Sequence, residues 1–253
     1  MKIFNKKTIC ALIFSLFSHY TLAQQVMIAV AGNFYKPLQE IAAKFEQQSG
    51  HKALLSVGST GKLYAQIVNG APFDIFIAAD QLRPAKLAEQ HLALKETQFT
   101  YAQGQLVLWS KDPKQIDIQG KILSTNELNH LAIANPKTAP YGAAAITVLK
   151  NMGLYEQLTP KLVLGQNVGQ SFQQISSGAV KQGIIALSQI LDNGKIIGGS
   201  SWIIPTSLYS LIKQDAIVLN KGKQNSAAIA FLDFLKSPVC LEIIRSYGYK
   251  VGA

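Results

Sequence analysis

Residues 26–45 have the sequence VMIAVAGNFYKPLQEIAAKF, and this segment sets the architecture expected for the rest of the chain. The run from Val26 to Ala31 is wholly apolar, which predicts a short strand buried on both faces. Gly32 and Asn33 break the run, and Pro37 suits the first turn of a helix, where its missing N–H costs nothing. Apolar residues then recur at helical spacing, at Leu38, Ile41, Ala42 and Phe45. The segment therefore predicts a strand, a tight turn and a helix whose free N–H groups suit an anion.

The same order of elements returns along the chain. Apolar runs at 53–57 and 72–79 alternate with helical patterns, which predicts a parallel sheet. Runs at 131–134, 161–164 and 183–187 predict a second α/β unit, and helices are expected at 226–235 and 238–247. We predict an α/β fold of two lobes, each a mostly parallel sheet flanked by helices. Lobe 1 is expected to span 24–102, lobe 2 to be inserted as 103–207, and 208–253 to return to lobe 1.

The first 23 residues have the pattern of a secretory signal peptide. Lys2, Lys6 and Lys7 form a charged start, an apolar segment follows, and Ala23 is the expected cleavage point. Cleavage would leave 230 residues and lower the formal net charge from +10 to +7. Cys240 would then be the single cysteine, so no intramolecular disulfide is expected. We predict an exported, periplasmic protein.

The remaining positive charge does not point to nucleic acid. Lysines are scattered without a run longer than a pair, and no basic stripe is interleaved with aromatic residues. The charge indicates a soluble surface that mildly favours anions.

Four turns between strands and helices share one chemistry: Gly32-Asn33, Ser59-Thr60, Pro140-Tyr141 and Asn167-Val168. In parallel sheets such turns lie at the carboxyl ends of strands, where ligands bind. The side chains of Asn33, Ser59, Thr60 and Tyr141 are hydrogen-bond donors, and none of the four turns contains Asp or Glu. Because a fully ionised oxyanion only accepts hydrogen bonds, the turns favour a small oxyanion without protons. Sulfate remains an alternative, and so does phosphate, although phosphate keeps a proton near neutral pH. Asp80 is the one nearby acceptor, with a structural role favoured, and Lys137 is a nearby cation.

Little in the sequence indicates an enzyme. The segment Gly58-Ser-Thr-Gly-Lys62 resembles part of a phosphate-binding P-loop, but Ser56 and Leu63 stand where the full pattern needs Gly and Ser or Thr. The histidines His51, His91 and His130 lie outside the turns and lack metal-ligand spacing. We predict no catalytic residues, no cofactor and no metal ligated directly by protein side chains. A hydrolase or transferase, or a surface adhesin, would need features that the sequence does not display.

Longer motifs resemble one family. They are Gly70-Ala-Pro-Phe-Asp-Ile-Phe-Ile-Ala-Ala-Asp80, Ala134-Asn-Pro-Lys-Thr-Ala-Pro-Tyr-Gly142, Gly165-Gln-Asn-Val168 and the ending Ser246-Tyr-Gly-Tyr249, beside Ala-Gly-Asn33-Phe and Gly-Ser-Thr60-Gly. Over nearly the whole exported chain, this pattern resembles the periplasmic molybdate-binding proteins of ABC transporters. The resemblance implies two lobes joined by two crossing strands that close on molybdate or tungstate. It also implies an inner-membrane permease with its ATPase subunits as partner, and we expect a monomer.

The resemblance also implies a set of ligand-binding residues: Gly32, Asn33, Ser59, Thr60, Tyr141 and Val168. Asn33 stands where many members have Ser, and Tyr141 and Val168 match positions that contribute mainly backbone N–H groups. Ala186 occupies a position where many members have a tyrosine donor. Asn33, together with the Gly32 N–H, is expected to compensate for that missing hydroxyl.

Overall fold

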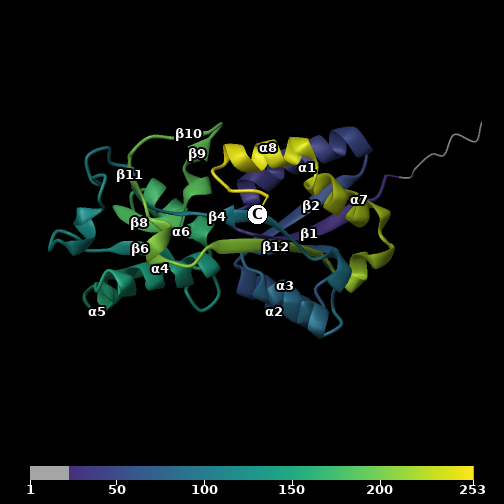
Figure 1. Cartoon of the computed structure of the whole chain (residues 1–253), viewed down its shortest axis with the longest axis horizontal. Helices are drawn as coiled ribbons and strands as arrows, with labels where there is room; N and C mark the ends of the chain where they lie inside the picture. Colours follow the sequence, from purple (N-terminus) through teal and green to yellow (C-terminus); the bar gives the residue numbers. More distant parts are fainter. Residues whose placement is uncertain (1–22, 253) are drawn as a thin grey trace, which may run out of the picture.

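A computed structural model describes residues 23–252, and the chain forms two lobes side by side (Figure 1). Residues 1–22, which hold almost all of the predicted signal peptide, lie outside the described residues. Each lobe is built on one five-stranded sheet. Within the described residues, no helix is both long and apolar enough to cross a membrane.

Lobe 1 is built on a sheet with the strand order β2-β1-β3-β12-β4. Its strands are β1 (Gln25–Ala31), β2 (Lys52–Gly58), β3 (Ile75–Ile77), β4 (Phe99–Gly104) and β12 (Ile212–Val218). Its helices are α1 (Tyr35–Ser49), α2 (Thr60–Val68), α3 (Leu82–Glu89), α7 (Ser226–Leu235) and α8 (Pro238–Ser246). Helices α1, α7 and α8 cover one face of the sheet, and α2 and α3 cover the other (Figure 1).

Strand β1 is buried on both faces, as its apolar sequence predicts. Ile28 and Val30 pack under α1 and α7, whereas Ala29 faces the cluster under α2 and α3. The helix that follows, α1, ends at Gly50, whose left-handed φ of 72° is the conformation that glycine adopts most readily at a helix C-terminus.

Lobe 2 has a sheet with the strand order β11-β5-β8-β6-β7. Its strands are β5 (Leu106–Ser110), β6 (Leu131–Ala134), β7 (Leu162–Gly165), β8 (Gln182–Ala186) and β11 (Ser200–Ile203). Its helices are α4 (Pro140–Asn151), α5 (Tyr155–Leu158) and α6 (Val168–Ser176). Short 3₁₀ turns complete the two lobes: η1 (Lys95–Thr97), η2 (Lys121–Ser124), η3 (Thr159–Lys161), η4 (Leu187–Gln189), η5 (Thr206–Leu208) and η6 (Asn220–Gln224).

The chain passes between the two sheets twice. It leaves lobe 1 at the end of β4 and enters lobe 2 as β5, with Gln105 between them, and it returns from β11 to β12. β1, β2 and β3 pair in parallel, as do β6, β7 and β8, whereas β5 and β12 pair antiparallel to their neighbours. In the described part of the chain, β4 and β11 lie at sheet edges and pair only with these two antiparallel strands, so the predicted parallel arrangement holds for β1 to β3 and for β6 to β8.

Two local features differ from the sequence-based expectations. The strand expected over 72–79 is shorter, because only Ile75–Ile77 pair as β3. A hairpin that the sequence analysis did not predict follows β8, formed by β9 (Leu191–Asp192) and β10 (Lys195–Ile196). Its turn is Asn193-Gly194, both with positive φ, which is the turn chemistry that two-residue hairpins favour.

Candidate functional site

All four sequence-predicted turns meet at one small cavity between the lobes, and most of the residues that line it are buried. The centre of a water-sized molecule has about 10 Å³ available to it in this cavity, which suits a compact ligand rather than an extended one. Lobe 1 contributes Ala31, Gly32, Asn33, Gly58, Ser59, Thr60 and Ala79 to its walls, and lobe 2 contributes Ala139, Pro140, Tyr141, Asn167 and Val168. The two lobes touch beside it, where the Gly61 N–H donates to the Thr138 carbonyl at 2.8 Å.

Three helices begin at the walls of this cavity. Helix α2 starts after Ser59, α4 after Ala139 and α6 after Asn167. The first turn of a helix leaves N–H groups without intrahelical partners, and the aligned peptide dipoles place about half a positive charge there. None of the three helices has an acidic residue in its first turn, so nothing on the helices neutralises these positive ends.

Local sequence explains why the helices start where they do. Pro140 is the first residue of α4, a position where its fixed φ is already helical. The Asn167 side chain accepts a hydrogen bond from the Gln170 N–H at 3.1 Å and so caps α6. Because that carbonyl oxygen is engaged by its own helix, Asn167 is an acceptor that the helix already satisfies.

Two hydroxyl groups on the cavity wall have hydrogens free to donate. Ser59 Oγ is buried and has no hydrogen-bond partner among the described residues, although an unpaired buried hydroxyl is costly. Thr60 Oγ1 accepts a hydrogen bond from the Ala79 N–H at 3.0 Å, which leaves its own proton free. The cavity therefore holds two hydroxyl donors from neighbouring residues.

Backbone N–H groups add to this set of donors. The N–H groups of Asn33, Ser59, Tyr141 and Val168 donate to no acceptor in the part of the chain that the structure describes. All four belong to residues that line the cavity. Unpaired buried N–H groups are rare in folded proteins, so a cluster of them indicates an acceptor-rich ligand.

Two groups of the first turn that were expected to contact a ligand have protein partners in the structure. The Gly32 N–H was expected to donate to the ligand, but it donates to the Gly58 carbonyl at 3.0 Å. The Asn33 side chain was also expected to donate, but its amide N–H₂ donates to Gln214 Oε1 at 2.7 Å and to the Tyr249 hydroxyl at 2.9 Å. Gly32 instead allows close approach, since a Cβ there would lie 2.9 Å from Asn167 Oδ1.

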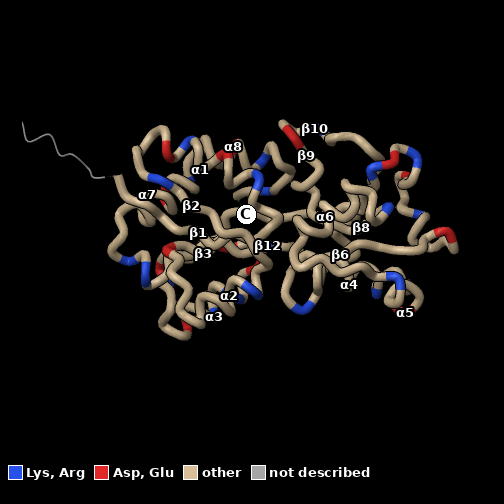
Figure 2. The backbone as a smooth tube through the Cα atoms, turned by 180° about the vertical axis from the view of Figure 1, so that it is seen from behind, with Lys and Arg blue, Asp and Glu red and all other residues tan. Residues whose placement is uncertain are grey.

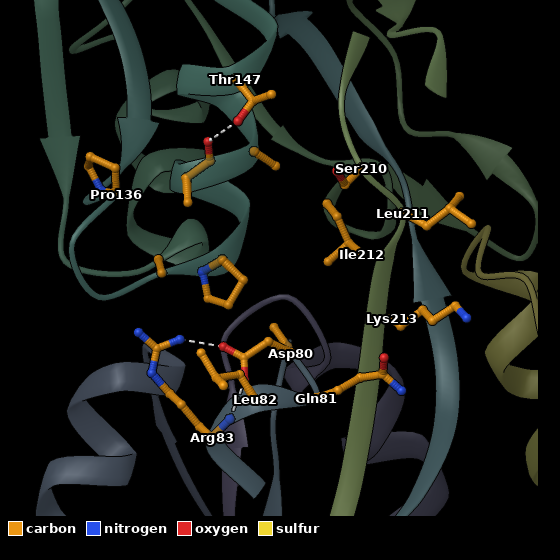
Figure 3. Close-up of a pocket in the computed structure, with 15 residues that line it drawn as sticks. Asp80, Gln81, Leu82, Arg83, Pro136, Thr147, Ser210, Leu211, Ile212 and Lys213 are labelled. Carbon is orange, nitrogen blue, oxygen red and sulfur yellow. Dashed lines mark hydrogen bonds and ion pairs between the residues drawn. The ribbon is translucent and has the colours of Figure 1, made fainter. Parts of the chain in front are cut away.

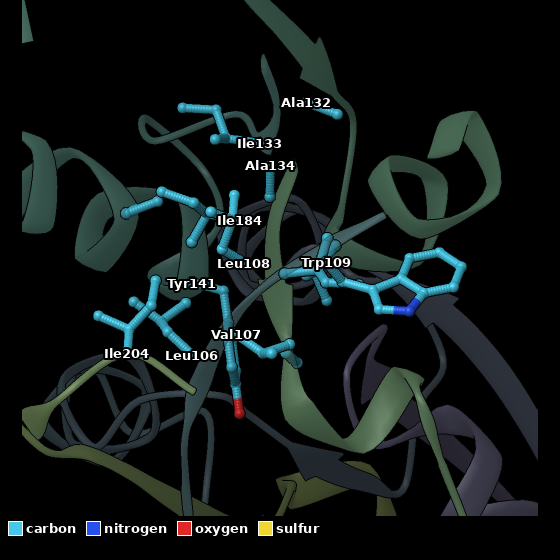
Figure 4. Close-up of a cluster of buried hydrophobic side chains, with 14 of the residues drawn as sticks. Leu106, Val107, Leu108, Trp109, Ala132, Ile133, Ala134, Tyr141, Ile184 and Ile204 are labelled. Carbon is cyan, nitrogen blue, oxygen red and sulfur yellow. The ribbon is translucent and has the colours of Figure 1, made fainter. Parts of the chain in front are cut away.

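Tyr141 has its ring in the lobe 2 core and its hydroxyl at the boundary between the lobes. Its ring lies among the buried side chains of lobe 2, and its hydroxyl points out of that cluster (Figure 4). The hydroxyl accepts a hydrogen bond from Gln214 Nε2 at 3.2 Å. The hydroxyl contacts Gln214, and the backbone N–H of Tyr141, at the cavity, is unpaired among the described residues. Ala186, where the family resemblance would place another tyrosine, is fully buried and does not line the cavity.

The charged residues near the turns have structural or peripheral positions. Asp80 accepts a hydrogen bond from the Arg83 N–H at 2.9 Å and pairs with the Arg83 guanidinium (Figure 3). It lines a separate pocket of about 410 Å³ rather than the small cavity. Lys137 is exposed and does not line the cavity either. The small cavity therefore has no ionisable carboxylate or amine on its walls.

A larger pocket of about 450 Å³ adjoins the cavity and shares Gly32 and Asn167 with it. Lys36 lies on its edge and reaches across to lobe 2, where it contacts the Leu191 carbonyl at 3.3 Å and Asp192 at 3.4 Å. Elsewhere, lysines and arginines lie among acidic residues over both lobes (Figure 2). Among residues 23–252, no group of three or more His, Cys, Asp or Glu is placed to hold a metal ion.

Three buried phenols, those of Tyr101, Tyr141 and Tyr249, are hydrogen-bonded to Asn33 or Gln214. Burial raises the pKa of Tyr249 to about 12, and hydrogen bonds from its neighbours offset part of that rise. Burial also raises the pKa values of Tyr101 and Tyr141 well above their usual value near 10, and the neighbouring Tyr249 adds to both shifts. All three phenols are therefore neutral at physiological pH.

These pKa shifts predict a loss of stability in alkali. The unfolded chain releases its phenolic protons near pH 10, whereas folded Tyr249 holds its proton until about pH 12. Stability from this group is thus fully present below pH 10 and falls as the pH rises to 12, by roughly 2 to 3 kcal/mol for Tyr249 alone. Urea unfolding between pH 8 and 12 measures the loss, and the slope should be smaller in Tyr249→Phe. A free energy of unfolding that stays constant over this range would contradict the shifts.

Sequence reasoning missed the residues behind the cavity. The Asn33 amide donates hydrogen bonds to Gln214 and Tyr249, which lie 181 and 216 residues further along the chain. Tyr249 belongs to a motif that the sequence analysis singled out, Ser246-Tyr-Gly-Tyr249, but no role followed from it. Gln214 lies between Lys213 and Asp215 in the strand Ile212–Val218, so nothing in the local sequence singled it out.

Comparison with known proteins places the chain in a family. Residues 26–250 match the family model described as bacterial extracellular solute-binding protein. The chain belongs to this family. It is 49% identical over 227 residues to the molybdate-binding protein ModA of Azotobacter vinelandii, with 90% of each chain covered. It is equally similar to ModA of Rhodobacter capsulatus, with 90% of this chain and 88% of the relative covered.

The fold agrees with a solved structure of this kind. The periplasmic molybdate-binding protein of Azotobacter vinelandii superimposes with a TM-score of 0.87 at 41% sequence identity. The match covers 90% of this chain and all of that one. This solute-binding protein therefore has the two-lobed α/β fold that its sequence predicts.

Proposed function

We propose that this solute-binding protein captures molybdate, and also tungstate, in the cavity between its lobes. In this proposal it delivers the oxyanion to an inner-membrane ABC permease with its ATPase subunits. The observation that carries the proposal is the chemistry of the cavity wall. The wall holds hydroxyl and backbone N–H donors without acceptors of their own, and it has no carboxylate. The names of the relatives, which share 49% of residues, agree with this assignment.

The proposed contacts come from both lobes. Lobe 1 supplies the N–H groups of Asn33 and Ser59 and the hydroxyl groups of Ser59 and Thr60, and lobe 2 supplies the N–H groups of Tyr141 and Val168. Each hydrogen bond to a charged group contributes about 1.5 to 3 kcal/mol. Three helix N-termini add a positive potential, and no described side chain with a formal charge lines the cavity.

The donor set explains selectivity between oxyanions. Hydrogen phosphate carries a proton that needs an acceptor, and the free groups on the cavity wall are donors. Molybdate, tungstate and sulfate are proton-free dianions near neutral pH, so charge does not distinguish them. We propose that size does, because rigid backbone donors on helix starts cannot move inward to contact the smaller sulfate.

The two-sided wall also links binding to lobe closure. We propose that a ligand enters this largely buried cavity when the lobes separate, and that it stabilises the closed form by contacting both of them. The closed form then presents one continuous surface to a permease. We propose that the protein acts as a monomer in the periplasm after removal of the signal peptide near Ala23, and that it needs no cofactor.

A titration panel tests the function. Isothermal titration calorimetry with molybdate, tungstate, sulfate and phosphate should give tight one-to-one binding of the first two. We expect sulfate to bind at least 100-fold more weakly than molybdate and phosphate to give no detectable heat. Tight sulfate or phosphate binding, with weak molybdate binding, would instead support the alternative of another oxyanion transporter.

A further inference from the structure

A hydrogen-bonded network of neutral side chains lies behind the cavity and joins the two lobes. Its members are Asn33, Tyr101, Tyr141, Ser188, Gln214 and Tyr249, all buried. Apart from Asn33 and Tyr141, none of them lines the cavity. Buried polar networks of this kind fix a single geometry when every member is satisfied.

Asn33 is the point on which the network converges. Its amide donates to Gln214 and to the Tyr249 hydroxyl, as described above. Its backbone carbonyl accepts from Ser188 Oγ at 2.9 Å and from the Tyr249 hydroxyl at 2.8 Å. The side-chain amide and the backbone carbonyl of Asn33 are therefore both hydrogen-bonded. Its backbone N–H has no acceptor among the described residues, and Asn33 lines the cavity.

The partners of Asn33 come from both lobes. Ser188 lies in η4 of lobe 2, and it also contacts the Tyr249 hydroxyl at 3.0 Å. Gln214 lies on β12 of the lobe 1 sheet and donates from its other end to Tyr141 of lobe 2. Gly104 provides the space for this contact, since a Cβ there would lie 1.8 Å from the Tyr141 hydroxyl oxygen.

We propose that Tyr249, Gln214 and Ser188 are positioning residues that fix the Asn33 turn and hold the lobes closed over the bound oxyanion. This inference rests on the proposed function and deepens it. Separation of the lobes would break the contacts of Ser188 with Asn33 and Tyr249. Contacts that form only in the closed state slow ligand release more than they speed ligand capture.

The test compares two substitutions that each remove one buried phenolic hydroxyl. Tyr249→Phe removes a network member, whereas Tyr209→Phe removes a hydroxyl that accepts from the Leu106 N–H at 3.0 Å outside the network. Stopped-flow tryptophan fluorescence with molybdate should show at least tenfold faster release from Tyr249→Phe, with an association rate within a few-fold of wild type. Tyr209→Phe should release molybdate at the wild-type rate.

Double substitution separates positioning from a general loss of stability. If Tyr249 acts through Asn33, then Asn33→Ala combined with Tyr249→Phe should bind no more weakly than Asn33→Ala alone. Ser188→Ala removes only a lobe 2 hydroxyl and provides a second variant, with faster release expected again.

The outcomes distinguish the two levels of the proposal. A wild-type protein that does not bind molybdate would refute the proposed function itself. A wild-type protein that binds molybdate, together with wild-type release rates in both Tyr249→Phe and Ser188→Ala, would overturn only the role of the network. Fully additive losses in the double variant would also overturn it, since they would mean that Tyr249 acts independently of Asn33.

Discussion

Ser59→Asp is expected to weaken molybdate binding at least 1,000-fold. Ser59 precedes the first residue of α2 and lies on the cavity wall, and aspartate is also favoured at this helix position, so the fold should be retained. Two unit charges about 4 Å apart repel by roughly 4 kcal/mol at an effective dielectric constant of about 20, and molybdate carries two charges. Since about 1.4 kcal/mol corresponds to a tenfold change, the loss exceeds three orders of magnitude.

Two further substitutions at the same position separate charge from shape. Ser59→Asn matches aspartate in size and lacks its charge, so the difference between the two variants measures repulsion alone. Ser59→Ala removes only the unpaired hydroxyl and should weaken binding roughly 10- to 150-fold, the value of one hydrogen bond to a charged group. Equal affinities of the Asp and Asn variants in calorimetry would show that the anion does not bind beside Ser59.

Val168→Pro is expected to weaken molybdate binding by roughly 10- to 150-fold, because it deletes one backbone N–H from the cavity wall. Val168 is the first residue of α6, where proline is favoured. Asn167 before it is already extended, with ψ of 173°, as a residue preceding proline requires. Deletion of a single donor is therefore possible here without breaking the helix.

The matched control is Val168→Ala, which keeps the N–H and shortens the buried side chain. It should lower thermal stability while leaving the molybdate affinity within a few-fold of wild type. If calorimetry gives Val168→Pro and Val168→Ala the same affinity, the N–H of residue 168 is not a ligand.

The sequence predicted those features that depend on neighbouring residues. Val26–Ala31 and the helical spacing after Pro37 specify a strand and a helix locally, and the structure has both as β1 and α1. Parallel sheets place the turns after their strands at one edge, so the four donor-rich turns could be expected to meet. The absence of carboxylates from those turns was also visible without a structure.

Features that depend on distant residues could not be predicted in this way. The sequence presents Asn33 as a donor in a turn, but the direction of its amide depends on Gln214 and Tyr249, which fold beside it from far along the chain. The Gly32 N–H likewise donates to Gly58 because β2 ends next to β1. In both cases a local pattern gives the type of group correctly, while tertiary pairing decides what that group binds.

The donor set has a consequence for how the protein works. A site made of neutral groups does not change its protonation in the physiological range, so binding should depend little on pH there. It also lacks a strong charge that would hold an anion when the lobes are open. Affinity then depends on closure, which brings the donors of both lobes to the ligand together.

Anomalous X-ray scattering tests the site most directly. Crystals of the protein grown with molybdate, measured at the molybdenum absorption edge, should show one strong peak inside the cavity. The oxygens around that peak should lie within hydrogen-bond distance of Ser59 Oγ and of the N–H groups of Asn33, Tyr141 and Val168. A peak in the larger pocket beside Lys36, or no peak at saturating molybdate, would contradict this account.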